Sequence, residues 1–116
     1  MVLPPEFDTL KTTLEGAVLH VEFNRPDRLN ALSHRLLTEV VELCARLRSE
    51  RDIRVVVVSG AGRAFSAGFD LDDFTSTAAG ESPRDGADLG RMATEALTDV
   101  PQLTIAAVHG HCVGGG

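Results

Sequence analysis

The chain has 116 residues, which is enough for one domain at most. Apolar residues make up 43% of it and charged residues 24%, an ordinary composition for a chain that folds around a core. The formal net charge of −6 argues against a surface for nucleic acid or anionic membranes, because either would need clustered Lys and Arg. An anionic small ligand is not excluded, because main-chain amides and a few basic side chains can hold one.

Cysteine usage and the first residues bear on the compartment. Cys44 and Cys112 show no disulfide or zinc spacing, which favours a reduced, cytoplasmic setting. The opening MVLPPEFDTL lacks the basic start and apolar core of a signal peptide. Every apolar run is far shorter than a membrane span. We therefore expect a cytoplasmic protein without a membrane partner.

The first third of the chain predicts a hairpin followed by a helix. Residues 8–15 and 17–24 form two strands with a turn at Glu15-Gly16, and the second strand alternates apolar and polar residues. After a break at Pro26, Ser33 is the predicted N-cap of a helix to about Arg51. Its apolar residues recur at helical spacing: Leu36, Leu37, Val40, Val41, Leu43, Cys44 and Leu47.

The remaining elements give an alternating α/β order. IRVVVVSG (53–60) predicts a parallel strand buried on both faces, and a loop rich in small residues follows it. Residues 75–86 are expected to be mobile and solvated. A second helix is predicted from about Ala87 to Asp99, and residues 102–108 predict another strand buried on both faces. The order suggests repeated β-β-α units.

Two segments, VVVVSGAGRAFSAGFD and TIAAVHGHCVGGG, each consist of a strand, a glycine and then small residues. Glycine allows a sharp turn and a close approach to main-chain amides. Two such loops at the same end of adjacent strands could direct separate N–H groups at one oxygen, as in an oxyanion hole. The alternative is that both are tight turns without a ligand.

Other motifs have weaker support. A dinucleotide fingerprint fails because its third glycine position is Phe65, and no lysine after Lys11 is available for a phosphate-binding P-loop. His109, His111 and Cys112 have no evident fourth ligand, so we predict no metal. Residues 70–73 could form a calcium loop or a catalytic pair, but a solvated loop with one carboxylate capping nearby amides is the simpler interpretation.

Three segments together carry a resemblance to a family. NRPDRLNALS (24–33), GRAFSAGFDL (62–71) and TIAAVHGHCVGGG (104–116) resemble, in order, three motifs of the enoyl-CoA hydratase/isomerase, or crotonase, family. The resemblance implies an α/β crotonase-like (ββα)n superhelix, of which residues 1–116 would be the N-terminal portion. It also implies an acyl-CoA substrate, with coenzyme A as part of that substrate and no other cofactor.

The resemblance further assigns residues to the site. The main-chain N–H groups of Phe69 and Gly115 match the pair that stabilises an enolate-like intermediate. Arg28 is assigned to a CoA phosphate. Arg25, Asn30 and Asp70 are expected to be structural, although Asp70 also belongs to the motif counted as CoA-binding. The assigned CoA-binding residues are Arg28, Ala31, Leu32, Ala64, Ala67, Gly68, Asp70 and Leu71.

The expected reaction is hydration of a 2-enoyl-CoA in fatty-acid or related acyl-CoA metabolism. The family's acid/base carboxylates fall beyond Gly116, so isomerase, hydrolase and decarboxylase reactions stay open. A non-catalytic acyl-CoA-binding protein and a small nucleotide-binding α/β domain are the alternatives of a different class.

The resemblance also implies that the 116 residues are incomplete as a functional unit and inactive alone. A helix would be expected to follow Gly114-Gly115-Gly116, because its N-terminus would orient the Gly115 amide. Self-association to a trimer or hexamer is expected.

Overall fold

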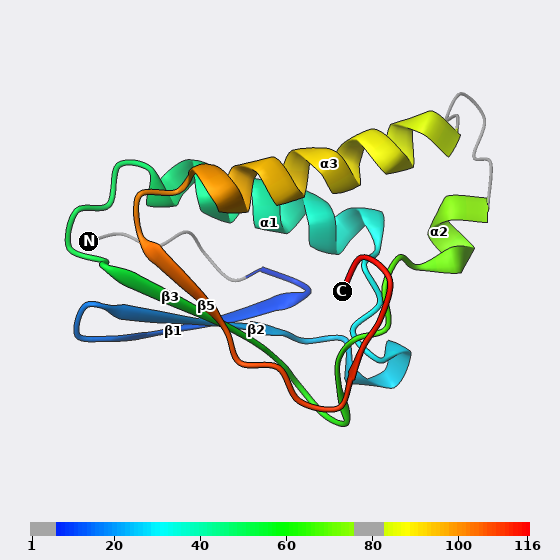
Figure 1. Ribbon diagram of the computed structural model, residues 1–116, viewed down its shortest axis with the longest axis horizontal. Helices are drawn as coiled ribbons and strands as arrows, with labels where there is room; N and C mark the ends of the chain where they lie inside the picture. Colours follow the sequence, from blue (N-terminus) through cyan, green and yellow to red (C-terminus); the bar gives the residue numbers. More distant parts are fainter. Residues whose placement is uncertain (1–6, 76–82) are drawn as a thin grey trace.

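The computed structural model describes residues 7–75 and 83–116 (Figure 1). Two long helices cover one face of a four-stranded sheet, and the N-terminal hairpin lies at one side of that sheet. In chain order the elements are β1 (Leu10–Glu15), β2 (Val18–Phe23), the 3-10 helix η1 (Pro26–Arg28), α1 (His34–Leu47), β3 (Val55–Gly60), β4 (Ala64–Ser66), α2 (Leu71–Thr75), α3 (Pro83–Asp99), β5 (Leu103–Ala106) and β6 (His111–Cys112).

The main sheet has the strand order β1-β2-β3-β5. β1 and β2 are antiparallel, with Leu14 opposite Leu19, whereas β2, β3 and β5 are parallel. The predicted hairpin and the predicted parallel strands are therefore confirmed. Parallel strands end at the same edge of a sheet, so β3 and β5 deliver the two glycine-containing segments to one end of the molecule.

Helix α1 begins where the sequence predicts. The Ser33 hydroxyl accepts a hydrogen bond from the Leu36 amide at 3.1 Å, which satisfies one of the first free N–H groups. The helix ends at Leu47 rather than near Arg51. Past that end the side-chain amide of Gln102 donates to the carbonyls of Leu47 and Glu50, at 2.7 and 3.0 Å.

Helix α3 packs along α1, and its residues Ala93 and Ala96 are buried, as is Val100 just after its end. It begins at Pro83, earlier than the predicted Ala87. The prediction of a mobile, solvated segment at 75–86 falls mainly on residues 76–82, which lie outside the described residues.

The core lies between the sheet and these two helices. The Phe23 and Phe65 rings contact each other there, with centroids 5.5 Å apart. Apolar residues at alternate positions of β2 and at helical spacing in α1 supply most of it: Leu19, Val21, Phe23, Leu36, Leu37, Val40, Leu43, Cys44 and Leu47.

The prediction that β3 and β5 are buried on both faces is wrong for this chain. β5 is an edge strand whose four residues are all exposed, Leu103 at 63%. In β3 only Val56 and Gly60 are buried. The physical reason is that α1 and α3 cover one face of the sheet (Figure 1). The continuous β-branched run of β3 predicted its parallel pairing, but the described elements cover only one face of that strand.

The segment predicted as a loop after β3 contains two further elements, β4 and α2. β4 pairs in parallel with β6 in a separate two-stranded sheet. Within the described residues, no helix combines the length and apolar character needed to cross a membrane.

The N-cap of α1 gives a stability prediction. Ser33→Ala removes the hydrogen bond to the Leu36 amide and should lower the free energy of unfolding by about 0.5–2 kcal/mol. Ser33→Asp keeps a capping oxygen and should stay close to the original chain. Urea unfolding followed by circular dichroism measures both, and equal losses in the two variants would contradict a capping role.

Candidate active site

The two glycine-containing segments meet side by side, as the sequence predicts. The β4–β6 pairing places Ala64 opposite His111, and the Phe65 amide donates to the His109 carbonyl at 3.0 Å. Beyond it, the Val113 amide donates to the Ser66 carbonyl at 3.1 Å. Main-chain hydrogen bonds therefore fix residues 64–66 against residues 109–113.

The two segments also approach each other closely at Gly68. This residue has φ = +94°, which an L side chain rarely adopts. A Cβ atom here would lie 2.8 Å from the Val113 carbonyl oxygen and 3.5 Å from the Gly115 nitrogen. A side chain at position 68 would thus separate the two segments, and its absence allows the amide of Gly115 to lie next to the chain that leads into Phe69.

Hydrogen bonding to Leu32 orients the Phe69 backbone. The Leu32 amide donates to the Gly68 carbonyl at 2.8 Å, and the Asp70 amide donates to the Leu32 carbonyl at 3.1 Å. Backbone groups alternate along an extended segment, so the Phe69 N–H is directed away from Leu32. Among the described residues, the Gly115 N–H has no hydrogen-bond partner. A separation of roughly 5 Å between the two nitrogens, which two hydrogen bonds to one oxygen would allow, stays a prediction.

Asn30 joins the segment before α1 to the segment after β3. It is fully buried and has φ = +54°, in the left-handed region that Asn tolerates better than most residues. Its side-chain amide donates to the carbonyls of Ala61 and Ala64 at 2.9 and 2.8 Å. The main-chain carbonyl of Asn30 accepts from the Ser66 hydroxyl at 2.9 Å. Asn30 therefore holds β4 in place from the opposite side to β6.

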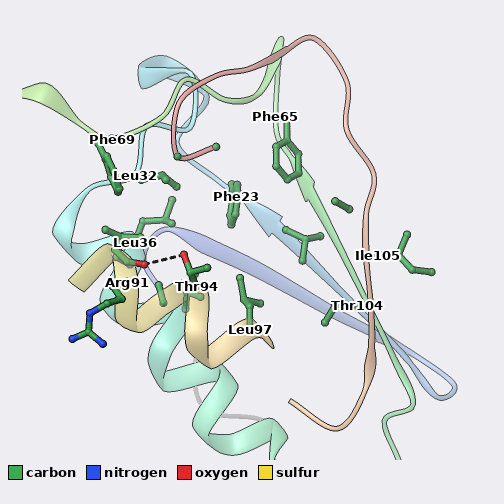
Figure 2. A pocket seen from close by; sticks show the side chains of 18 residues that line it. Phe23, Leu32, Leu36, Phe65, Phe69, Arg91, Thr94, Leu97, Thr104 and Ile105 are labelled. Carbon is green, nitrogen blue, oxygen red and sulfur yellow. Dashed lines mark hydrogen bonds between the residues drawn. The ribbon is translucent and has the colours of Figure 1, made fainter. Parts of the chain in front are cut away.

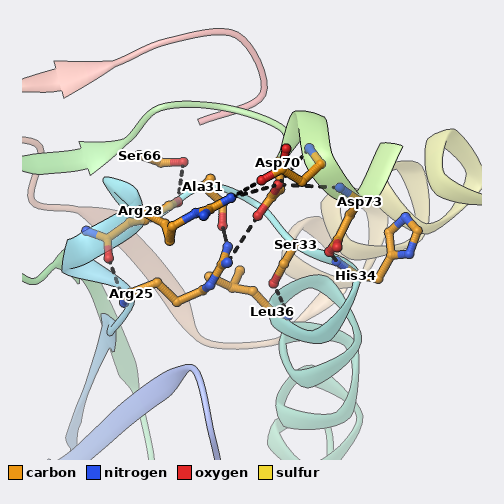
Figure 3. A network of polar contacts seen from close by, with 11 residues as sticks. Arg25, Arg28, Ala31, Ser33, His34, Leu36, Ser66, Asp70 and Asp73 are labelled. Atoms are coloured by element: carbon orange, nitrogen blue, oxygen red, sulfur yellow. Dashed lines mark hydrogen bonds and ion pairs between the residues drawn. The ribbon is translucent and has the colours of Figure 1, made fainter. Parts of the chain in front are cut away.

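An ion pair reinforces this junction (Figure 3). The Arg25 guanidinium donates to the Asp70 carboxylate at 3.0 Å and to the Ala31 carbonyl at 2.6 Å. The other Asp70 oxygen accepts from the amides of Asp72 and Asp73, at 3.0 and 3.4 Å, and so caps α2. These contacts agree with the structural roles expected of Arg25, Asn30 and Asp70, and with one carboxylate of the acidic loop capping nearby amides.

The environment of Asp70 sets its protonation. Burial alone would raise the pKa of this carboxyl group, but the hydrogen bonds from Arg25 and from the Asp73 and Asp72 amides outweigh that effect and lower it. Asp70 is therefore held as a carboxylate, with its oxygens directed at the protein.

Arg28, assigned to a CoA phosphate, lies in η1 beside two carboxylates. It forms an ion pair with Asp72 and approaches Asp70 at 3.9 Å. The hydrogen bond and charge of Asp72, followed by the charge of Asp70, raise the pKa of Arg28. Its side chain is 52% exposed, so a phosphate could reach it. Because Asp72 already forms an ion pair with the guanidinium, the phosphate would compete with that carboxylate.

The other residues assigned to CoA fall into two groups. Leu32 and Gly68 lie beside Gly115, as does the Phe69 ring. Ala64 is buried in β4, whereas Ala67 and Leu71 are exposed, Leu71 at 74%. Ala31 is half-buried, and its carbonyl is bonded to Arg25. The structure thus places Leu32 and Gly68 beside Gly115, and Arg28, Asp70 and Leu71 around the start of α2.

A cavity of about 470 Å³ opens beside Phe69 and Gly115 (Figure 2). It lies between the sheet and the helices α1 and α3, and Phe69, Gly115 and Gly116 belong to its wall. Most of the lining is apolar, including Leu36, Val58 and Phe65. The polar residues of the lining are Arg91, Thr94 and Thr104, so no carboxylate of the described residues lines it.

The described part of the chain contains no group of three or more His, Cys, Asp or Glu side chains placed to hold a metal ion. His111 and Cys112 belong to β6, and a ring nitrogen of His109 lies 2.8 Å from the Gly62 carbonyl oxygen.

Sequence reasoning missed two features of the site. Helix α2 was not predicted, although an Asp followed by Leu71, Asp72 and Asp73 is a helix-start pattern that could have indicated it. Gly90 of α3, which lies against the Phe69 ring, was also missed. A glycine inside a helical pattern is the only signal for such a contact, and it does not identify the partner.

Comparison with known proteins shows a family. The family model described as enoyl-CoA hydratase/isomerase matches residues 13–116. The mitochondrial Delta(3,5)-Delta(2,4)-dienoyl-CoA isomerase of Mus musculus is 38% identical over 90% of this chain and 35% of its own length. A probable enoyl-CoA hydratase of Bacillus subtilis is 37% identical over 75% of this chain and 34% of its own length.

Solved structures agree as well. The crystal structure of an enoyl-CoA hydratase from Bacillus anthracis superposes with a TM-score of 0.87 at 31% identity, covering 94% of this chain and 43% of that one. The fold is thus the N-terminal portion of the crotonase α/β architecture. The chain belongs to the enoyl-CoA hydratase/isomerase family and spans about a third of the length of the curated relatives it matches.

The lowered pKa of Asp70 gives a prediction of pH dependence. A carboxylate whose folded pKa is lowered stabilises the fold above its unfolded pKa, near 4, and this stabilisation is lost as the pH falls through the folded pKa. Asp70→Asn should therefore unfold more easily at pH 7, by about 1–3 kcal/mol, and the difference should shrink below about pH 4.

Urea unfolding between pH 7 and pH 2.5 measures this difference. Asp72→Asn is the control, because Asp72 is 77% exposed and should cost less than about 1 kcal/mol. A difference between Asp70→Asn and the original chain that is constant over the whole pH range would contradict the assignment.

Proposed function

We propose that this chain binds the thioester of an acyl-CoA and polarises its carbonyl with the main-chain N–H groups of Phe69 and Gly115. The observation that carries the proposal is the contact at Gly68, where the absence of a side chain lets the Gly115 amide lie against the segment that leads into Phe69. Two donors from adjacent segments can stabilise negative charge that develops on one oxygen, which is the electrostatic requirement for an enolate-like intermediate.

The substrate class follows from the surroundings of the two amides. The adjoining cavity is apolar and suits a hydrocarbon acyl group, whereas the surface around η1 and α2 is polar and carries Arg28. Hydration of a 2-enoyl-CoA is the reaction we propose first. The sequence similarity to dienoyl-CoA isomerases supports a double-bond isomerisation as the second candidate reaction. The described residues bind and polarise the thioester, and they place no carboxylate in the cavity to move a proton.

Two candidates of another class make different predictions. A non-catalytic acyl-CoA-binding protein would bind the thioester and polarise it without turnover. A nucleotide-binding domain would bind free nucleotide as tightly as acyl-CoA. Comparing the affinities for crotonyl-CoA, free CoA and AMP by isothermal titration calorimetry tests for a nucleotide-binding domain, and we expect crotonyl-CoA to bind most tightly. Turnover of crotonyl-CoA separates an enzyme from a non-catalytic acyl-CoA-binding protein.

The main-chain role of Phe69 is tested with a proline substitution. Phe69→Pro removes the N–H, whereas Phe69→Leu keeps the donor and an apolar side chain. With crotonyl-CoA labelled with ¹³C at the carbonyl, we expect a downfield shift of that carbon on binding to the original chain. Phe69→Pro should abolish the shift and weaken binding roughly threefold to tenfold, the value of one hydrogen bond. Equal loss of the shift in both variants would favour a side-chain role.

We also propose self-association to a trimer or hexamer, in the cytoplasm and without a cofactor besides the CoA of the substrate. Exposed apolar side chains on one region of the chain support the assembly: Leu103, Ile105, Val108 and Val113. Light scattering after gel filtration should give three or six times the 12.4 kDa chain mass. A mass of a single chain at micromolar concentration would contradict it.

A further inference from the structure

The side chain of Phe69 lies between two glycines that are far apart in sequence. A Cβ atom at Gly90, on α3, would lie 2.9 Å from both Cε1 and Cζ of the ring. A Cβ atom at Gly115 would lie 3.2 Å from Cζ and 3.4 Å from Cε1. The same edge of the ring therefore lies next to the backbone of both Gly90, on α3, and Gly115, in the glycine turn.

Within the described residues, the turn that carries Gly115 is anchored on either side of that residue: Val113 lies against Gly68, and Gly116 packs closely on Ser66, where an added Cβ atom would lie 2.7 Å from the Ser66 Cβ atom. Its main-chain hydrogen bonds are from Val113 to Ser66, at 3.1 Å, and from Gly116 to Val113, at 2.9 Å. Gly115 has no side chain of its own, and residues 109–116 are all exposed. Besides the Phe69 ring, the group nearest to the position of a Gly115 Cβ is a Leu32 methyl group, at 3.3 Å.

We infer that the Phe69 ring is a positioning group: packed on Gly90, it holds the Gly115 amide beside the Phe69 amide. The role of the two amides in this inference rests on the proposed function. The packing of the Phe69 ring on Gly90 and Gly115 is independent of that function. One residue then supplies a main-chain donor with its backbone and locates the second donor with its side chain. The absence of a side chain at position 90 is part of the arrangement, because a methyl group there would push the ring towards Gly115.

The mobility of Gly115 tests the contact directly. In the ¹⁵N-labelled 116-residue chain, Phe69→Ala should lower the heteronuclear NOE of the Gly115 amide and speed its hydrogen exchange roughly tenfold or more. Phe69→Leu should give an intermediate effect. Met92→Ala is the matched control, because Met92 is 46% exposed on the same helix as Gly90 and does not line the cavity.

Gly90→Ala tests the other side of the ring. The added methyl group should displace the ring and shift the Gly115 amide resonance, and the same substitution should leave that resonance unchanged when Phe69 is already Ala. Dispersed amide spectra show that each variant is folded. A Gly115 amide that is as rigid in Phe69→Ala as in the original chain, or a Gly90→Ala effect that persists without the ring, would overturn the inference.

Binding of ¹³C-carbonyl crotonyl-CoA separates this inference from the proposed function. Phe69→Ala should reduce the carbonyl shift by more than half while the dissociation constant changes less than threefold. If Gly115 is loosened as expected but the original chain gives no carbonyl shift, the positioning role stands and the proposed function fails. If the original chain gives the shift and Phe69→Ala changes neither the shift nor Gly115, the positioning role fails and the proposed function stands.

Discussion

The candidate site depends on the hydrogen bonds of the buried Asn30 side chain. Its amide group donates to two carbonyls of the segment after β3, and its oxygen accepts from the Arg25 main-chain amide. The main-chain carbonyl of Asn30 also accepts from the Ser66 hydroxyl in that segment. Removing the Asn30 side chain would leave several buried polar groups without partners, and each of these costs free energy. Because β6 pairs with β4, a displacement of β4 would also displace the glycine turn. Asn30 thus fixes the position of β4 and, through the β4–β6 pairing, that of the glycine turn.

Much of the fold could be predicted from the sequence, because the local signals agree with one another. The alternation in β2, the Ser33 cap and the spacing of apolar residues in α1 all predict elements that the structure contains. The proximity of the two glycine-containing segments was also predictable, because parallel strands end at one edge of a sheet.

The rest depends on contacts that local patterns do not encode. β4 and β6 are too short to give a periodic signal, and their pairing joins residues far apart in sequence. The burial of β5 was overestimated because a short apolar run indicates a strand but not how much of it neighbouring elements cover. The three motifs predicted the family correctly, whereas the contact of Phe69 with Gly90 follows from the packing of α3 alone.

The pairing of β4 with β6 has a consequence for the order of folding. Parallel pairing of Ala64 with His111 closes a long loop, which costs conformational entropy. A two-stranded sheet forms few hydrogen bonds to offset that cost. Pairing of β3 with β5, extended by the bond from the Ala107 amide to the Val58 carbonyl, brings the two segments together and shortens the distance still to be closed. We therefore expect the β4–β6 pairing to form after the main sheet, and weakening of the β3–β5 pairing to loosen residues 64–66 and 109–113 before the hairpin or α1.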